Sequence, residues 1–207
     1  MGKVKIKKND VWIDMTPMSD VMVLLLTFFM LTSTFVKNEP VKVVTPGSVS
    51  EIKVPEKDVL NILVAKDGKV FMSMDNQRQM LDVLSGMTGQ FGVSLNKQQM
   101  AKFQKDAMWG VPMEKLSAYL SLDAHAMADA LKKEGIPTDS IVTNGTKGKS
   151  EFQLWVTEAR NVNPDIKLAI KADQGTPYKV VKKVMSELQD MSENRYYLIT
   201  QYKKQED

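Results

Sequence analysis

The chain has 207 residues, a net charge of +3, and a composition that is 43% hydrophobic and 26% charged. A mean hydropathy of −0.25 is typical of a largely aqueous protein and disfavours one with many membrane spans. Without cysteine there is no disulfide or thiolate metal site, and the lone histidine, His125, argues against a zinc centre or a Ser-His-Asp triad. The small net charge argues against nucleic-acid binding. We therefore expect no enzyme activity, no metal and no organic cofactor.

Residues 15–36 form the longest apolar stretch, and Asp20 is its only ionisable side chain. About 20 helical residues cover the roughly 30 Å hydrocarbon core of a bilayer, so we predict one transmembrane helix here. A cleaved signal peptide is disfavoured because the stretch is long, contains an acid and lacks a small-residue cleavage site. The other alternative is a buried helix of a soluble protein, although such stretches are usually shorter.

Lysines in residues 1–14 predict the orientation of this helix. Lys3, Lys5, Lys7 and Lys8 crowd a short arm, and arms rich in lysine stay on the cytoplasmic side. The rest of the chain should then lie outside the cytoplasm. Binding of these lysines to anionic lipid or to a partner loop is the alternative. Pro17 suits the first turn of a helix, where the N–H that proline lacks has no partner, and we predict the helix start there.

Asp20 is the candidate functional residue. A charged carboxylate at mid-bilayer costs about 2.5–3.5 kcal/mol on insertion scales, so Asp20 needs a proton or a partner. At helical spacing it shares one face with Thr27 and Thr34. This face indicates a polar seam for proton movement. Threonine hydroxyls in helices also bond back to carbonyls one turn earlier, so both interpretations of the threonines stay open.

The sequence from Trp12 through Thr16-Pro17 and Asp20 to Met30 resembles the N-terminal signature of the ExbD/TolR family. In that family a short cytoplasmic arm leads through a Thr-Pro pair to an aspartate that begins a single transmembrane helix. Three later stretches are similar to the family's periplasmic domain: 41–48, 59–72 and 166–207. Residues from about 75 to 149 depart from the short family members, so the resemblance implies nothing about their role.

The resemblance implies a subunit of the ExbB–ExbD motor, in which an ExbD homodimer threads a multi-pass ExbB-like ring in the bacterial inner membrane. Proton flow past the helix aspartate drives motion that is passed to a TonB-like protein, which opens outer-membrane transporters. By this resemblance Asp20 takes the proton-translocating position, Pro17 matches the family's proline, and protons are the coupling ion. A TolR-like envelope-maintenance subunit, a gliding or motility stator, and a membrane-tethered periplasmic binding protein are the alternatives.

Residues 37–58 contain three prolines and no helical periodicity, which predicts a linker. Val41, Val43 and Val44 could form an edge strand that pairs with a partner or with a second copy, because an unpaired backbone edge is a template for strand addition. A solvated tether is the equally supported alternative.

Residues 59–207 predict a small α+β domain. A Lys-Asp-Gly-Lys turn between two apolar runs, 59–65 and 70–72, indicates a hairpin. Four further signals follow along the chain: a capping box at Ser150–Gln153 that begins a helix to about 161, an alternating strand at 166–172, a helix opened by Pro177, and a strand at 196–202. This order predicts a small sheet packed by two helices.

The insertion, from about 75 to 149, predicts helices at 77–84, 97–105, 113–120 and 124–133, with glycines and prolines between them. Its methionines and Trp109 could form an adaptable partner surface, but their helical spacing favours a core. His125 beside Asp123 and Asp129 is a weak metal candidate.

The predicted fold class is thus α+β, with a single N-terminal transmembrane helix. The predicted boundaries are a cytoplasmic arm at 1–14, the transmembrane helix at 15–36, a periplasmic linker at 37–58, and a periplasmic α+β domain at 59–207 that contains the insertion.

Overall fold

The computed structural model describes residues 14–32, 40–48, 57–139 and 148–202. The chain divides into two compact units, Met1–Val36 and Lys37–Asp207, and the second is called the C-terminal unit. The predicted boundaries of the arm, linker and insertion stay predictions.

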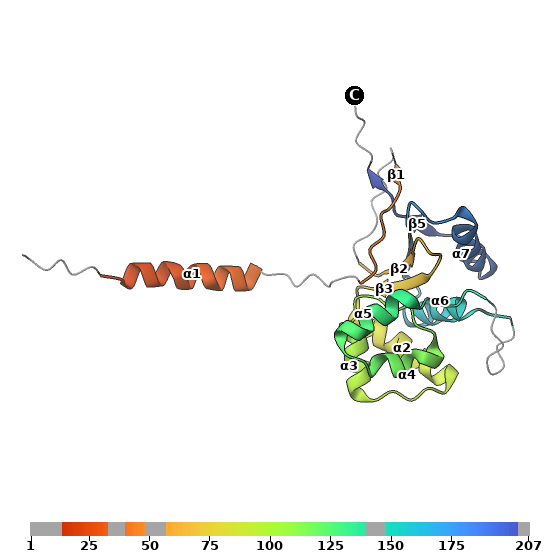
Figure 1. The fold of residues 1–207 in the computed structure, drawn as a ribbon, viewed down its shortest axis with the longest axis horizontal. Coiled ribbons are helices and arrows are strands. Elements are labelled where there is room, and N and C mark those ends of the chain that lie inside the picture. Colours follow the sequence, from red (N-terminus) through yellow and green to blue (C-terminus); the bar gives the residue numbers. More distant parts are fainter. Residues whose placement is uncertain (1–13, 33–39, 49–56, 140–147, 203–207) are drawn as a thin grey trace, which may run out of the picture. The chain divides into compact units, whose positions relative to one another are not determined.

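The first unit contains helix α1, Thr16–Thr32, which has no buried residue (Figure 1). Its 17 residues are fewer than the predicted 22, and at about 1.5 Å per residue they cover only about 26 Å. Across the described residues no helix is both long enough and apolar enough to span a membrane. This finding contradicts the predicted fold class with its transmembrane helix at 15–36. The described residues instead form a mixed α+β structure with seven helices and a small sheet.

Four strands of the C-terminal unit form a sheet in the order β3-β2-β4-β5. Strand β2, Val59–Val64, pairs antiparallel with β3, Val70–Met74, which confirms the predicted hairpin. Gly68 closes the turn with a φ of 83°, a conformation that glycine adopts without strain. On its other side β2 pairs parallel with β4, Lys167–Ala172, the strand expected from alternation. Strand β5, Tyr196–Leu198, pairs parallel with β4.

The predicted strand at 196–202 is broken in two. Its second part, β6, Gln201–Tyr202, leaves the main sheet and pairs parallel with β1, Gly47–Ser48. The chain therefore changes partner between Leu198 and Gln201, from β4 to a segment that precedes the domain in sequence.

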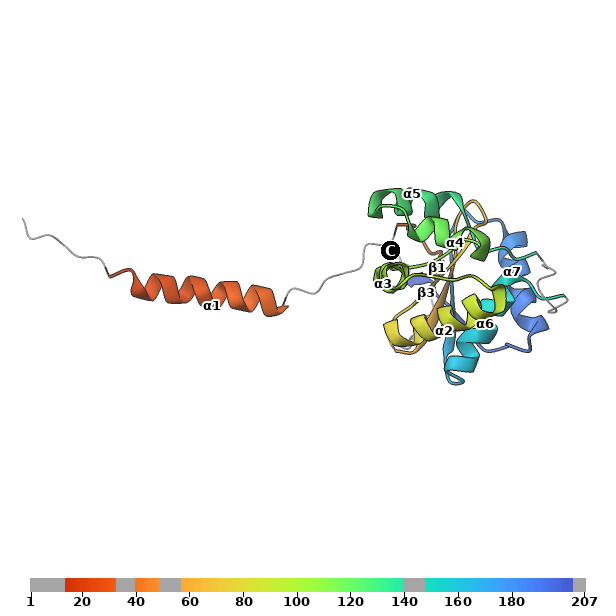
Figure 2. The same cartoon turned by 90° about the horizontal axis from the view of Figure 1, so that it is seen from below.

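Helices α6, Glu151–Val162, and α7, Tyr178–Asp190, contribute to the same core as the sheet. The predicted capping box of α6 is confirmed, since the Ser150 hydroxyl accepts the Gln153 N–H and the Gln153 side chain accepts the Ser150 N–H. Helix α7 buries only Val184 and Leu188, whereas α6 is buried along most of its length because α2 packs on it. Figure 2 shows α2 and α6 side by side.

The insertion forms α2, Gln77–Phe91, α3, Lys97–Lys105, α4, Met113–Leu120, and α5, Ala124–Lys133. The last three match their predicted ranges. Helix α2 is longer than predicted because Gly86 and Gly89 lie inside it, and the helix ends only at Gly92, whose φ is 66°.

The insertion shares its core with the sheet. Met72 of β3 and Trp109 exchange two backbone hydrogen bonds of 2.8 Å, and the Trp109 ring lies 5.6 Å from Phe103 and 5.5 Å from Trp155. Most of the insertion's methionines are buried with them: Met80, Met87, Met108, Met113 and Met127. The core interpretation of these methionines is confirmed.

Gly110 allows this packing, because a Cβ there would lie 2.1 Å from Cδ1 of the buried Phe71 ring. We predict that Gly110→Ala lowers the free energy of unfolding by about 1–3 kcal/mol, the usual cost of overpacking. Gly89→Ala is the matched control, since nothing lies within 4 Å of its added methyl group. That change should stabilise α2 by about 0.5–1 kcal/mol. Urea unfolding measures both, and equal stabilities for the two variants would contradict the packing described here.

Candidate functional site

Asp20 lies one turn into α1 and is the only ionisable residue of that helix. It is exposed, and no described residue donates a hydrogen bond to its carboxylate. The apolar side chains around the helix are exposed as well, including Val21, Leu26 and Phe29 at 56%, 64% and 65%. The helix thus combines one unsatisfied acid with an uncovered apolar surface.

The start of α1 is fixed by Asp14 rather than by Asp20. The Thr16 hydroxyl and backbone N–H both donate to Asp14 Oδ1, and these bonds hold the pKa of Asp14 below its usual value. Pro17 follows as the second residue of the helix, in its first turn. The carboxylate that caps the helix and the carboxylate inside it are therefore separate groups.

The Thr27 hydroxyl donates to the carbonyl oxygen of Leu24 at 2.9 Å, as the back-bonding interpretation expects. Thr32 does the same to Phe28 at 2.8 Å. Thr34, the third member of the predicted seam, lies outside the described residues. A role for Asp20, Thr27 and Thr34 in proton movement stays a prediction.

The predicted partner strand is held against its own domain. Val44 donates its N–H to Asp173 Oδ2 at 2.9 Å and accepts the Gln174 N–H at 2.7 Å. Val41 and Val43 are partly buried against the core, whereas the Val44 side chain is 57% exposed. The backbone of Val44 is thus already bonded, and partner binding by these valines stays a prediction.

An open strand edge lies at β5, Tyr196–Leu198, within the stretch 196–202 that the sequence predicts as one strand of the sheet. Ile199 donates its N–H to Ile170 at 2.9 Å and Gln201 donates to Pro46 at 3.0 Å, so both point to the same side. Backbone groups alternate in direction along a strand, so those of Tyr196 and Leu198 in β5 face the other side. No described strand pairs with that side. The Leu198 side chain is 45% exposed beside it.

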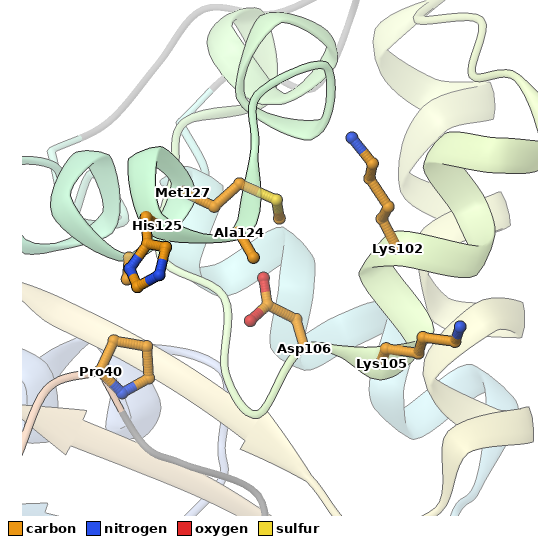
Figure 3. A pocket seen from close by; sticks show the side chains of 8 residues that line it. Pro40, Lys102, Lys105, Asp106, Ala124, His125 and Met127 are labelled. Carbon is orange, nitrogen blue, oxygen red and sulfur yellow. The ribbon is translucent and has the colours of Figure 1, made fainter.

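A hollow of about 460 Å³ lies between α3 and α5 (Figure 3). The Asp106 carboxylate points toward Ala124 and Met127, while Lys105 points away. The Tyr119 hydroxyl donates to Asp106 at 2.9 Å, and burial raises the pKa of this phenol, which keeps it a donor. The hollow therefore has an oriented acid against a mainly apolar wall. The described residues contain no cluster of three or more metal-ligating side chains, and His125 is exposed.

These features define a class of protein: one apolar helix with a single internal carboxylate, followed by a mixed α+β domain with an open sheet edge. A family model described as "Biopolymer transport protein ExbD/TolR" matches residues 7–203, nearly the whole chain, and the protein belongs to this family. The family consists of stator-type subunits of biopolymer transport that are typically associated with the inner membrane and work with ExbB-like partners. No curated protein and no solved structure gives a significant match.

Asp173 helps to hold the 40–46 segment, because its carboxylate accepts the Val44 N–H at 2.9 Å. It also accepts the Gly175 N–H at 2.8 Å within its own turn. Both bonds hold the pKa of Asp173 below its usual value, so its contribution to stability is present near neutral pH and is lost as pH falls through the lowered value. We predict that Asp173→Ala accelerates hydrogen exchange of the Val44 amide at pH 7. Asp165→Ala, a change at an exposed acid outside this contact, is the control. Unchanged Val44 exchange in Asp173→Ala would contradict this role.

Proposed function

We propose that this chain is a proton-driven motor subunit that works with an ExbB-like ring and a TonB-like protein to power nutrient import across the outer membrane. The observation that carries the proposal is Asp20, a lone exposed acid in an apolar helix, in a chain of the ExbD/TolR family.

The apolar surface of α1 supports a surrounding partner. Exposed apolar surface of this extent marks an interaction site, and an ExbB-like ring would cover it on all sides. A carboxylate enclosed by apolar walls is costly to keep charged, so Asp20 takes up a proton from one side and releases it to the other. Each elementary charge that moves through 100 mV releases about 2.3 kcal/mol, which is enough to bias a conformational step.

In this proposal the C-terminal unit passes the motion on. Its β5 edge presents backbone groups that no described strand pairs with, beside the exposed side chain of Leu198. A strand of the TonB-like protein adds there, taking main-chain hydrogen bonds from the edge and apolar contact from the side chain. A second copy of the chain provides the homodimer that threads the ring.

The central prediction concerns Asp20→Asn, which keeps the size of the side chain and removes its titration. We expect proton-driven uptake to fall at least tenfold, while the amount of protein in the membrane fraction stays unchanged. Asp14→Asn is the matched control, because asparagine can still accept the Thr16 bonds and uptake should be retained. Normal uptake with Asp20→Asn would overturn the mechanism.

Partner identity is tested by extraction of the full chain in mild detergent. We expect a larger multi-pass subunit in ring form to co-purify. Photo-crosslinking from position 200 should capture a TonB-like protein, and a crosslink from position 89, an exposed position of α2 in the insertion, serves as control. Recovery of a TolR-type envelope partner would replace the nutrient-import assignment, and recovery of this chain alone would contradict a motor of any kind.

A further inference from the structure

Glu151 is a buried acid that belongs neither to α1 nor to the open strand edge. It is the first residue of α6 and is only 2% exposed. Its Oε1 accepts the backbone N–H of Met113 at 3.0 Å and the indole N–H of Trp155 at 3.3 Å. Met113 begins α4, so one carboxyl group joins the insertion to the helix that packs beneath the sheet. Both hydrogen bonds use the same oxygen, and the one from Met113 crosses the contact between α4 and α6, which is called the joint below.

No described cation neutralises this carboxyl group. Its hydrogen-bond donors are two neutral N–H groups. The carboxylate of Glu114, in α4, repels the negative charge of ionised Glu151. Three other charged groups of the surrounding elements bond to other residues. Lys115 of α4 pairs with Glu134 at 2.7 Å, Glu187 of α7 accepts the Ser150 hydroxyl, and Glu158 of α6 bonds Gln90 and Asn161.

The ionised form of Glu151 is therefore the costly one. Loss of solvent raises the pKa of Glu151 to about 7, against smaller lowering effects of the Trp155 and Met113 hydrogen bonds, and Glu114 adds to the rise. The partial positive charge at the start of α4 favours the carboxylate only modestly. Once protonated, Glu151 still accepts both N–H bonds, so the joint keeps its hydrogen bonds without a buried charge.

We propose that Glu151 is a proton-binding site that sets how firmly the insertion helix α4 is held against α6. With the proton bound, the joint stays closed. When the proton leaves, the carboxylate gains by reaching water, which requires α4 and α6 to separate locally. The site is independent of Asp20 and of the proposed motor function, since it lies within the C-terminal unit and needs only a change in ambient pH.

The direction of the effect follows from linkage. A pKa that is higher in the closed joint than in the opened one makes closure most favourable at acid pH, and the advantage is lost as pH rises through about 7. One such group changes the opening equilibrium by about tenfold between pH 6 and pH 8. This pH dependence of opening should be confined to the contact between α4 and α6 and should not extend to the strands of the sheet.

The test is hydrogen exchange of the full chain from pH 5.5 to 8.5, corrected for the intrinsic pH dependence of exchange. Amides at the start of α4 should open about tenfold more at pH 8 than at pH 6. Glu151→Gln keeps the oxygen that accepts both N–H bonds and cannot ionise, so its α4 protection should not change with pH. Glu114→Gln is the companion variant: removal of the repelling charge should move the transition to lower pH and reduce the change between pH 6 and pH 8.

A direct titration covers the case in which Glu151→Gln fails to fold. In wild-type protein labelled with ¹³C-glutamate, the Glu151 carboxyl resonance should titrate with a midpoint near 7. A midpoint near the ordinary value of glutamate, or α4 protection that is flat with pH in the wild type, would overturn the proposal. So would a Glu151→Gln variant with the same pH dependence as the wild type.

Discussion

Backbone hydrogen bonds to β3 attach the insertion to the edge of the sheet: the Ile136 N–H donates to Val70, and Met72 and Trp109 exchange a pair. They place the Trp109 ring between Phe103 of α3 and Trp155 of α6, so three distant parts of the chain meet in one aromatic cluster. Apolar burial extends on both sides of the bridge, from the sheet through α6 to the helices of the insertion. Glycine at position 110 is needed beside it so that the Phe71 ring can approach.

Local sequence signals predicted much of this fold. Turn residues indicated the hairpin, the Ser150 capping box indicated α6, and strict alternation indicated β4, because each of these depends on neighbours a few residues away. Helix α2 was predicted too short because Gly86 and Gly89 resemble breaks. Gly86 instead lies against Glu158 of α6, where a Cβ would come within 2.5 Å of the carboxylate. The break in the 196–202 strand depends on pairing with β1, which local pattern cannot indicate.

The two acids, Asp20 and Glu151, show the same contrast between local and long-range information. Asp20 could be identified from the sequence because its apolar neighbours are consecutive in the chain, although its function there stays a prediction. Glu151 could not, since a glutamate in the first turn of a helix is ordinarily a solvated residue that favours the helix dipole. Its burial is created by α4, whose first residue lies 38 positions earlier. The length of α1 is a third case: the apolar stretch is continuous, but the described helix ends at Thr32.

The insertion also determines which surface the sheet offers to other chains. A sheet ordered β3-β2-β4-β5 has two edges, and an unpaired edge is a template for strand addition. The Met72–Trp109 bridge occupies the β3 edge, and Trp109 itself is almost fully buried, so a partner strand cannot enter there without displacing the core. The β5 edge has no such cover in the described residues. Residues 40–48 do not lie along this edge, because they bond to Asp173 and pair with β6 instead. Removing the insertion would therefore open a second pairing edge at β3 and expose Trp155, the member of the aromatic cluster that lies outside the insertion. In this chain the insertion is part of the core, and it leaves β5 as the sheet edge that no described residue covers.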